Sequence, residues 1–143
     1  MASPDARLLT SALNEYLNGL YPPEDNFLAL DDDEVRDGRG VFLIARTDEG
    51  PVGCGAVRRI SESTAEIKRM FVRPEARGLG IGRRLLAELH NWAADAGVVR
   101  LVLETGVNQP QALALYRRFG YVRIPCFGEY AGASQSVCYE LRL

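Results

Sequence analysis

The stretch RPEARGLGIGRRLL (Arg73–Leu86) carries glycines at positions 78, 80 and 82, directly before a helical pattern. Glycine at this density weakens helices and strands, which indicates that something approaches the backbone closely. The unpaired N–H groups and the positive dipole end of the following helix can bind phosphate. Arg77, Arg83 and Arg84 add positive charge. We expect the loop to hold the phosphates of a nucleotide-like cofactor. The alternative is a tight strand-to-helix turn with solvated arginines.

Two common phosphate-binding loops do not match this spacing. A P-loop needs Gly-Lys-Ser/Thr after a longer spacing, whereas Arg83 and Arg84 follow the last glycine here. A dinucleotide-binding fingerprint needs a further glycine at a position where this chain has Arg83 or Leu85. Both of these common phosphate-binding motifs therefore fail on spacing.

The composition predicts one globular domain. The chain has 143 residues, of which 47% are hydrophobic and 25% charged, and its net charge of −2 argues against nucleic acid as a partner. We find no apolar run long enough for a membrane span and no signal peptide at the start. Three widely spaced cysteines (Cys54, Cys126 and Cys138) suggest neither a zinc site nor a disulfide framework. We expect core cysteines, no metal and a reduced cytoplasmic location.

Hydrophobic periodicity places these motifs on a mixed α/β sheet. Helices are expected over residues 8–20, after the glycine loop up to Gly97, and from a cap at Asn108 up to Gly120. A loop with a short helix is expected in the acidic segment 24–40. The continuous apolar character of 98–104 favours a parallel strand. The other strands are expected at 41–46, 52–60, 65–72, 121–124 and 136–143.

Two motifs together resemble the Gcn5-related N-acetyltransferase (GNAT) superfamily. Arg77, Gly80 and Gly82 match its pattern Arg/Gln-x-x-Gly-x-Gly/Ala. NQPQALALYRRFGY matches its second motif, with Asn108, Ala112, Tyr116 and Gly120 four residues apart. The resemblance is clear over 41–121. It implies the acyl-CoA N-acyltransferase fold, a central mixed sheet with splayed parallel strands flanked by helices, in a single domain over 1–143. It also implies that acetyl-CoA is the co-substrate and that its acetyl group passes directly to a primary amine.

The resemblance also assigns cofactor contacts. The pantetheine arm would pair with the strand before the loop, and a backbone N–H of Met70 or Phe71 would stabilise the oxyanion. Asn108 is expected as a helix cap with a second role at the cofactor. The implied pyrophosphate and pantetheine contacts are, in chain order, Met70, Phe71, Val72, Arg77, Gly78, Leu79, Gly80, Ile81, Gly82 and Arg83.

Glu66 is the first candidate for the general base. It lies in AEI, like the base of the histone-acetylating branch of the superfamily, although the loop after Val72 is two residues shorter than in that branch. A glutamate beside a water-poor cleft can have a raised pKa and deprotonate an ammonium through water. Strand alternation would put Glu66, Lys68, Met70 and Val72 on one face, barring a bulge. The alternative is an exposed strand residue opposite a basic neighbour.

Tyr116 and Glu104 are the remaining candidates for the site, whereas the histidine of the chain is not. Tyr116 matches the family tyrosine that donates a proton to the departing sulfur, and a core tyrosine is the alternative. It is also expected to contact the cofactor. Glu104 ends the apolar strand and is a second candidate for base or substrate contact. His90, the only histidine, is expected to be a surface or packing residue.

The acceptor is expected to be an amine of a small molecule or peptide. An acidic cluster would favour a cationic acceptor, or would be a solvated loop. The segment 126–130 is expected to close over the substrate. No clear strand precedes the first helix, where many family members have one. A homodimer is compatible with the sequence, and a non-catalytic acyl-CoA-binding module or a nucleotide-dependent transferase is the alternative function. The cluster comprises Glu24, Asp25, Asp31, Asp32, Asp33 and Glu34.

Overall fold

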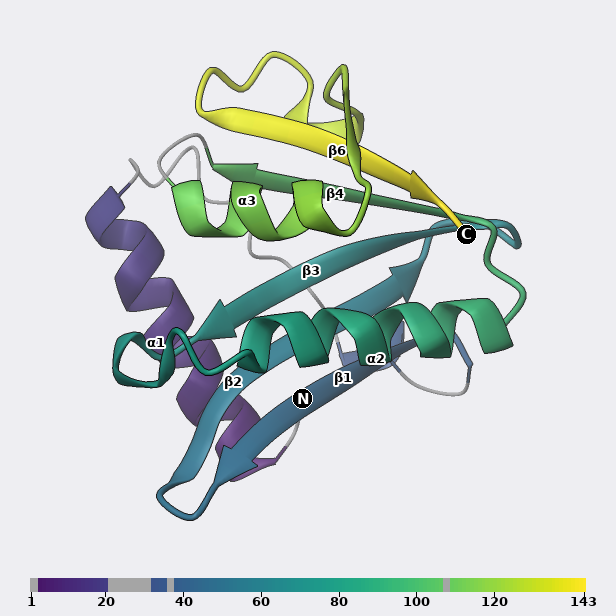
Figure 1. Ribbon diagram of the computed structural model, residues 1–143. Coiled ribbons are helices and arrows are strands. Elements are labelled where there is room, and N and C mark those ends of the chain that lie inside the picture. Colours follow the sequence, from purple (N-terminus) through teal and green to yellow (C-terminus); the bar gives the residue numbers. More distant parts are fainter. Residues whose placement is uncertain (1–2, 21–31, 36–37, 107–108) are drawn as a thin grey trace.

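The computed structural model describes residues 3–20, 32–35, 38–106 and 109–143 of the chain. This part of the chain forms one mixed sheet in the order β1-β2-β3-β4-β6-β5 (Figure 1). All the strands expected from the sequence are present, with bounds that differ by at most two residues. They are β1 Gly40–Thr47, β2 Gly50–Arg59, β3 Thr64–Val72, β4 Arg100–Gly106, β5 Val122–Ile124 and β6 Ser136–Arg142.

Three α-helices cover the two faces of this sheet. The helix α1 (Pro4–Leu20) packs on one face, and α2 (Ile81–Asp95) and α3 (Pro110–Arg118) pack on the other (Figure 1). Short 3-10 turns add η2 (Asp32–Val35), η3 (Pro74–Ala76) and η4 (Gly128–Tyr130). The described chain enters α1 directly at Pro4, so among the described residues no strand precedes it, as the sequence indicated.

The core is divided by the sheet into two clusters. On the α1 face, Leu9 and Leu13 pack with Cys54 and Phe71. The larger cluster fills the face under α2 and α3, where apolar helix stripes meet inward-facing strand residues. Its fully buried members include Val57, Leu86, Leu89, Ala93 and Leu101. Because both faces are covered, the apolar strand β4 is buried on both sides, as its sequence predicted.

The parallel strands β3 and β4 separate towards their carboxyl ends. They are paired only from Thr64 opposite Arg100 to Ile67 opposite Leu103. Beyond this point β3 continues to Val72 and β4 to Gly106 without pairing to each other. The sheet therefore splits at the edge where the glycine loop begins, which confirms the expected splayed arrangement.

A β-bulge at Arg69 corrects the expected orientation of the β3 side chains. Cys54 is opposite Phe71 and Ala56 is opposite Lys68, so β3 has one extra residue here, and Arg69 adopts a φ of 59°. Glu66 and Lys68 consequently lie on the α1 face, whereas Met70 packs on the opposite core beneath the helices. The expectation that Glu66, Lys68, Met70 and Val72 share one face is wrong, because the bulge reverses the alternation.

Two smaller expectations also need correction. Cys126 and Cys138 form a disulfide, with their Cα atoms 5.1 Å apart, so the chain does have a disulfide. Cys54 is a free, buried cysteine, as expected. The N-cap of α3 is Gln109, with Pro110 in the first turn, and the expected cap Asn108 lies outside the described residues.

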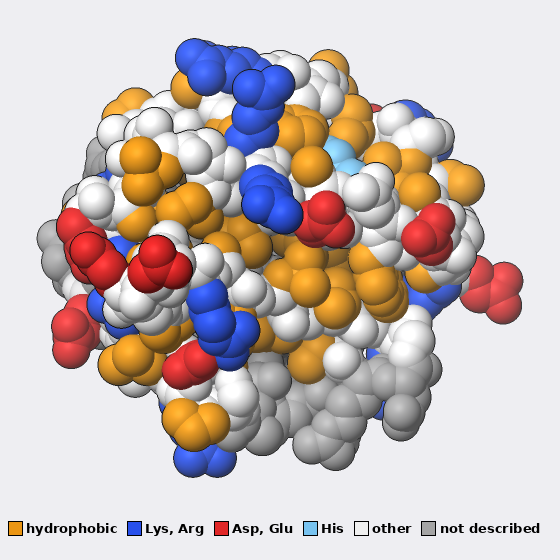
Figure 2. Space-filling model, turned by 60° about the horizontal axis from the view of Figure 1, so that its bottom comes forward, with side chains coloured by type: hydrophobic (Ala, Val, Ile, Leu, Met, Phe, Trp, Pro, Cys, Tyr) orange, Lys and Arg blue, Asp and Glu red, His pale blue; other side chains and the backbone are white. Residues whose placement is uncertain are grey.

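The surface carries both signs of charge. On the face turned forward in Figure 2, acidic and basic side chains are interspersed around hydrophobic ones rather than gathered by sign. In the part of the chain described here, no helix is long and apolar enough to cross a membrane.

Candidate active site

The glycine loop connects the end of β3 to the start of α2. Gly78 and Gly80 have φ values of +82° and +80°, which L-amino acids with side chains rarely adopt. A Cβ at either position would meet no protein atom within 4 Å, so the backbone there borders open space. The Nε of Arg77 donates a hydrogen bond to the Val72 carbonyl (3.1 Å), and this bond fastens the loop to the strand. The loop thus presents an exposed stretch of backbone that this hydrogen bond holds against the end of β3.

The N-terminus of α2 offers backbone donors to an anion. Its N-cap is Gly80, which has no side chain to cap the helix, and the first turn holds no acidic residue. The amide of Arg84 bonds to the Gly80 carbonyl at 3.0 Å, whereas the amides of Ile81 and Gly82 have no carbonyl partner within the helix. These donors, the helix dipole and the exposed Arg83 and Arg84 fit a pyrophosphate group.

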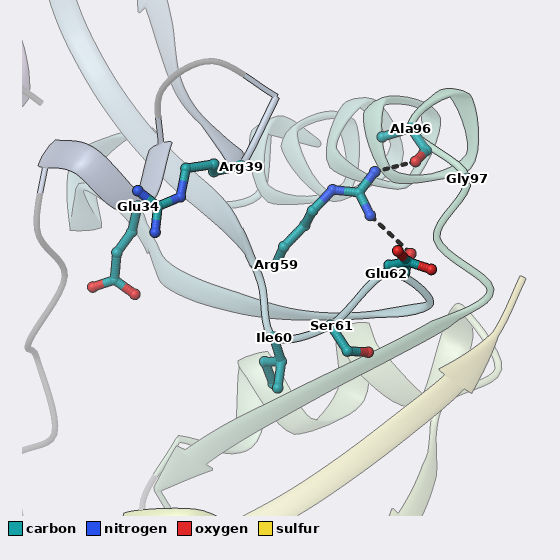
Figure 3. A pocket seen from close by; sticks show the side chains of 8 residues that line it. All are labelled: Glu34, Arg39, Arg59, Ile60, Ser61, Glu62, Ala96 and Gly97. Carbon is teal, nitrogen blue, oxygen red and sulfur yellow. Dashed lines mark hydrogen bonds between the residues drawn. The ribbon is translucent and has the colours of Figure 1, made fainter.

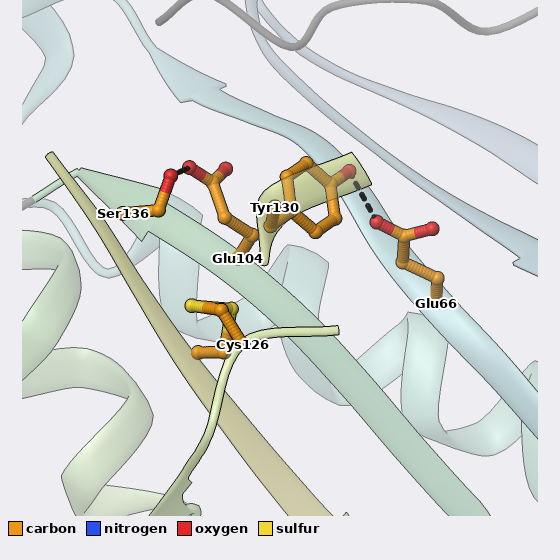
Figure 4. Close-up of a disulfide and its surroundings, with 6 residues drawn as sticks. Glu66, Glu104, Cys126, Tyr130 and Ser136 are labelled. Atoms are coloured by element: carbon orange, nitrogen blue, oxygen red, sulfur yellow. Dashed lines mark hydrogen bonds between the residues drawn. A yellow bond between two sulfur atoms is a disulfide. The ribbon is translucent and has the colours of Figure 1, made fainter. Parts of the chain in front are cut away.

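Glu66 is buried on the α1 face beside the split, with only 1% of its surface exposed. Its Oε1 accepts hydrogen bonds from Arg58, with Nε at 3.0 Å and the second guanidinium nitrogen at 2.8 Å. Its Oε2 accepts one from the Tyr130 hydroxyl at 2.6 Å (Figure 4). The alternative was an exposed strand residue opposite a basic neighbour. Arg58 is that basic cross-strand neighbour, but the Glu66 side chain is buried rather than exposed. Both carboxylate oxygens are therefore held by protein donors.

Glu104 lies on the same face of the sheet as Glu66. In the parallel pair Val102 is opposite Glu66, and Glu104 follows Val102 by two residues in β4, so its side chain lies on that same face. Its Oε2 accepts a hydrogen bond from the Ser136 hydroxyl at 2.7 Å (Figure 4). Burial raises the pKa of Glu104, and the nearby charge of Glu66 raises it further, while the Ser136 hydrogen bond opposes both. Glu104 therefore accepts a proton more readily than an ordinary glutamate.

Lys68 balances part of this negative charge. It is buried, at 6% exposure, on the same face as Glu66. Burial lowers its pKa, while the charges of Glu66 and Glu129 act in the opposite direction. The α1 face beside the split thus combines acidic and basic groups instead of a purely acidic surface.

Tyr116 lies on α3, which packs on the face of the sheet opposite α1. It is buried, and its ring meets that of Tyr121 edge-on at 5.6 Å. Burial raises the pKa of Tyr116, and the charge of Glu104 raises it further, so its hydroxyl stays protonated at neutral pH. A protonated hydroxyl can donate a proton to a leaving thiolate.

His90 is a packing residue, as the sequence indicated. Its ring packs edge-on against Phe119, and its Nε2 is 2.7 Å from the Tyr121 hydroxyl. Burial lowers its pKa to about 4, so the ring is neutral at physiological pH. His90 thereby links α2 to the end of α3.

Sequence reasoning did not single out three side chains that shape this site. Arg58 and Tyr130 hold Glu66, and Ser136 holds Glu104. The only available signal was the position of Tyr130 in the CFGEY segment, which was expected to close over the substrate. Of the expected acidic cluster, Glu24, Asp25 and Asp31 lie outside the described residues. Glu34 forms an ion pair with Arg58 at 2.7 Å.

A hollow of about 560 Å³ lies at the opposite end of α2 from the glycine loop, beside Ala96 and Gly97 (Figure 3). The guanidinium of Arg59 in this hollow donates hydrogen bonds to the carbonyls of Gly38, Glu62 and Ala96. Arg59 thus ties together three connecting segments, and its donors serve the fold. Among the described residues no group of His, Cys, Asp or Glu side chains could hold a metal ion.

Comparison with known proteins decides the family. The sequence profile of the Acetyltransferase (GNAT) family matches residues 7–121. The chain belongs to this family. An IAA acetyltransferase of Azospirillum brasilense is 46% identical over 133 residues, which cover 92% of this chain and 86% of that protein. The GNAT match and this relative show that the chain is an acetyl-CoA-dependent N-acetyltransferase that uses an amine acceptor.

Solved structures agree with this fold. An acetyltransferase from Streptococcus agalactiae superposes with a TM-score of 0.80 at 25% identity, over all of this chain and 94% of that chain. A GNAT acetyltransferase from Elizabethkingia anophelis, solved with acetyl-CoA bound, superposes with a TM-score of 0.63 at 21% identity, over 78% and 80% of the two chains. The split mixed sheet is therefore the acyl-CoA N-acyltransferase fold.

Proposed function

We propose that this GNAT enzyme transfers the acetyl group directly to the primary amine of a small molecule or peptide that reaches the β3–β4 split from the α1 face. The observation that carries this proposal is the placement of two carboxylates, Glu66 and Glu104, on that face of two separating strands. The proposal treats residues 1–143 as one N-acetyltransferase domain. A homodimer and a cytoplasmic location stay predictions.

The cofactor contacts expected from the sequence are retained in this proposal. Met70, Phe71 and Val72 pair with the pantetheine arm, and the loop from Arg77 to Arg83 holds the pyrophosphate. The open backbone at Gly78 and Gly80 and the uncapped α2 support the second assignment. The bulge at Arg69 supports the first, because it interrupts the β2–β3 ladder next to Met70 and Phe71, one of which supplies the proposed oxyanion N–H.

Two glutamates compete for the role of general base. The role of Glu66 as the base stays a prediction, but hydrogen bonds from Arg58 and Tyr130 occupy both of its carboxylate oxygens. Glu104 has one described donor and a raised pKa, so the contacts favour Glu104 as the group that removes the proton from the amine. In this arrangement Glu66 supplies a fixed negative charge on the acceptor side.

Tyr116 is proposed as the proton donor to the thiolate of coenzyme A. Its burial and its raised pKa keep the proton on the hydroxyl until a strong base forms nearby. Attack by the neutral amine on the thioester carbonyl forms the amide bond and breaks the C–S bond. The amine proton passes to Glu104, directly or through water, and the Tyr116 proton passes to sulfur.

Thermal unfolding with and without acetyl-CoA is the first test, with ATP and NAD as controls. Ligand at about a hundred times its Kd adds roughly 2.7 kcal/mol to the free energy of unfolding. We expect acetyl-CoA alone to raise the melting temperature, by about 5 °C or more. A shift with ATP instead would favour the nucleotide-dependent alternative.

Acetyl transfer is then measured as release of coenzyme A with spermidine, kanamycin, lysine and a lysine-containing peptide. Mass spectrometry of the product shows whether an amine carries the acetyl group. A Tyr116→Phe variant should bind acetyl-CoA normally but release coenzyme A at least about tenfold more slowly. Binding of acetyl-CoA without transfer to any amine would favour an acyl-CoA-binding module.

A further inference from the structure

The segment 126–136, which we call the strap, connects β5 to β6 and is fastened at three points. Cys126 at its start is joined to Cys138 of β6 by the disulfide. In its middle, the Tyr130 hydroxyl donates to Glu66, and at its end the Ser136 hydroxyl donates to Glu104. Figure 4 shows these contacts side by side on one face of the sheet. The strap therefore touches both candidate carboxylates of the proposed site.

The strap is folded so that Tyr130 points into the sheet. The Tyr130 amide donates to the Phe127 carbonyl at 2.9 Å, and the Ala133 amide donates to the Tyr130 carbonyl at 3.1 Å. The rings of Phe127 and Tyr130 pack edge-on at 5.3 Å, and Tyr130 is only 2% exposed. The tyrosine reaches Glu66, 64 positions earlier in the chain, only while this fold is kept.

Before the strap, the backbone pairing is short. The strand β5 has three residues and makes three pairs with β6, of which the last is Ile124 opposite Cys138. The disulfide from Cys126 follows two residues later. The disulfide therefore attaches the chain to β6 beyond the last of the three backbone pairs, and it fixes the position of the start of the strap.

We propose that Tyr130 is a positioning residue for acetyl transfer and that the Cys126–Cys138 disulfide holds it on Glu66, which makes the acceptor side redox-sensitive. The inference concerns the same site and rests on the proposed function. With Arg58 on one oxygen and Tyr130 on the other, the Glu66 carboxylate has one orientation. Its fixed charge then acts on Glu104 and on the incoming amine, while the cofactor loop lies apart from the strap.

The redox step is a two-electron exchange with a dithiol. The dithiol becomes a cyclic disulfide, the Cys126–Cys138 bond breaks, and each sulfur takes up one proton. A hollow of about 510 Å³ is lined by Pro125, Cys126, Ala133 and Cys138, so a small reductant can approach the bond. Reduction frees the start of the strap, and Tyr130 loses its fixed place on Glu66.

The test compares oxidised and dithiothreitol-reduced enzyme, together with Cys126→Ala and Tyr130→Phe. Cys54→Ala is the matched control, because it removes the free cysteine and leaves the strap intact. Thiol alkylation followed by mass spectrometry counts the free thiols and so shows whether the disulfide is formed. Brief chymotrypsin digestion reports strap opening at Phe127 and Tyr130. The amine found by the acceptor panel gives kcat and KM, and thermal shift gives the Kd of acetyl-CoA.

We expect reduction to expose the strap to chymotrypsin and to lower kcat/KM for the amine about tenfold, the usual effect of losing one hydrogen bond to a charged group. The Kd of acetyl-CoA should not change. Cys126→Ala should behave like reduced enzyme without responding to dithiothreitol, and Tyr130→Phe should show the kinetic loss with an intact disulfide. Cys54→Ala should respond like the parent chain.

Several results would overturn the inference. They are three free thiols in the air-oxidised enzyme, a strap that stays protected after reduction, and unchanged amine kinetics in Tyr130→Phe. A Kd of acetyl-CoA that rises as amine turnover falls would mean general unfolding rather than positioning. If no amine is acetylated by oxidised enzyme, the proposed function fails, whereas digestion and alkylation still decide whether the disulfide holds the strap.

Discussion

Glu66 and Glu104 are two glutamates on the same face of the sheet, and their neighbours give them different chemistry. Arg58 and Tyr130 satisfy Glu66, whereas Glu104 is half-buried, has one donor among the described residues, Ser136, and has a raised pKa. A partly desolvated carboxylate with few hydrogen-bond donors is the better proton acceptor near neutral pH. The roles therefore follow from hydrogen-bond partners rather than from residue type.

The pH profile of kcat/KM separates the two glutamates. A base works only when deprotonated, so activity should fall as the pH drops through the raised pKa of Glu104. Glu104→Gln should lower kcat/KM by about a hundredfold and remove this acid limb. Glu66→Gln should keep the limb but move it to lower pH, because the charge of Glu66 raises the pKa of Glu104. Loss of the limb in Glu66→Gln alone would reverse the assignment.

His90 should make the folded state sensitive to mild acid. Its pKa is about 4 in the folded chain and about 6.5 when unfolded. Because the folded pKa is depressed, the stabilisation is complete above pH 6.5 and is lost as the pH falls towards 4. Urea unfolding should show that the parent chain loses about 2 kcal/mol more than His90→Gln between pH 7.5 and 4.5. Equal losses in the two proteins would mean that His90 is solvated.

The helix α2 carries a glycine with positive φ at each end, and only one end lies at the cofactor loop. Gly80 precedes the helix with φ +80° and Gly97 follows it with φ +83°, and neither has a protein atom within 4 Å of an added Cβ. A side chain should therefore cause similar backbone strain at either end of α2. Only the glycine at the cofactor loop should contribute to phosphate binding.

Gly80→Ala and Gly97→Ala should each lower the free energy of unfolding by about 1 kcal/mol. Only Gly80→Ala should also weaken acetyl-CoA binding, because its methyl group projects into the open space at the loop. Urea unfolding gives the first quantity and isothermal titration the second. An equal loss of affinity in both variants would place the pyrophosphate elsewhere.

Local patterns predicted the elements well, because glycine spacing and apolar periodicity act over a few residues. The loop from Arg77 to Gly82 and the parallel strand β4 were both found in this way. The bulge was not, because an arginine gives no sign of positive φ, and the loss of polar/apolar alternation at Lys68–Arg69 does not by itself show that the strand gains a residue there. The disulfide and the Tyr130–Glu66 bond join distant positions, which spacing alone does not bring together.

The sheet as a whole consists of two halves that share few backbone bonds. β1, β2 and β3 form one half and β4, β6 and β5 the other, joined by a parallel ladder of four residue pairs. Packing under α2 and α3 supplies the rest of the connection. A ligand that lies in the split and bonds to β3 should therefore hold the halves together.

Hydrogen exchange should show this effect. With saturating acetyl-CoA we expect slower exchange at the carboxyl end of β3 (68–72) and in the first turn of α2, because the ligand occupies those amides. The β1–β2 turn around Glu49 is an internal control that should not change. Protection confined to the strap would contradict the proposed cofactor position.

The extra residue at Arg69 also sets which side chains of β3 face the acceptor and which face the helices. Even-numbered side chains face the acceptor before the bulge and the helices after it. Deleting one residue there would remove the bulge and leave Met70 in the helix-side core and Phe71 on the α1 face, because the lost residue is the one that breaks the alternation. Flattening the bulge at unchanged chain length would instead turn Met70 out of that core and bring Phe71 into it.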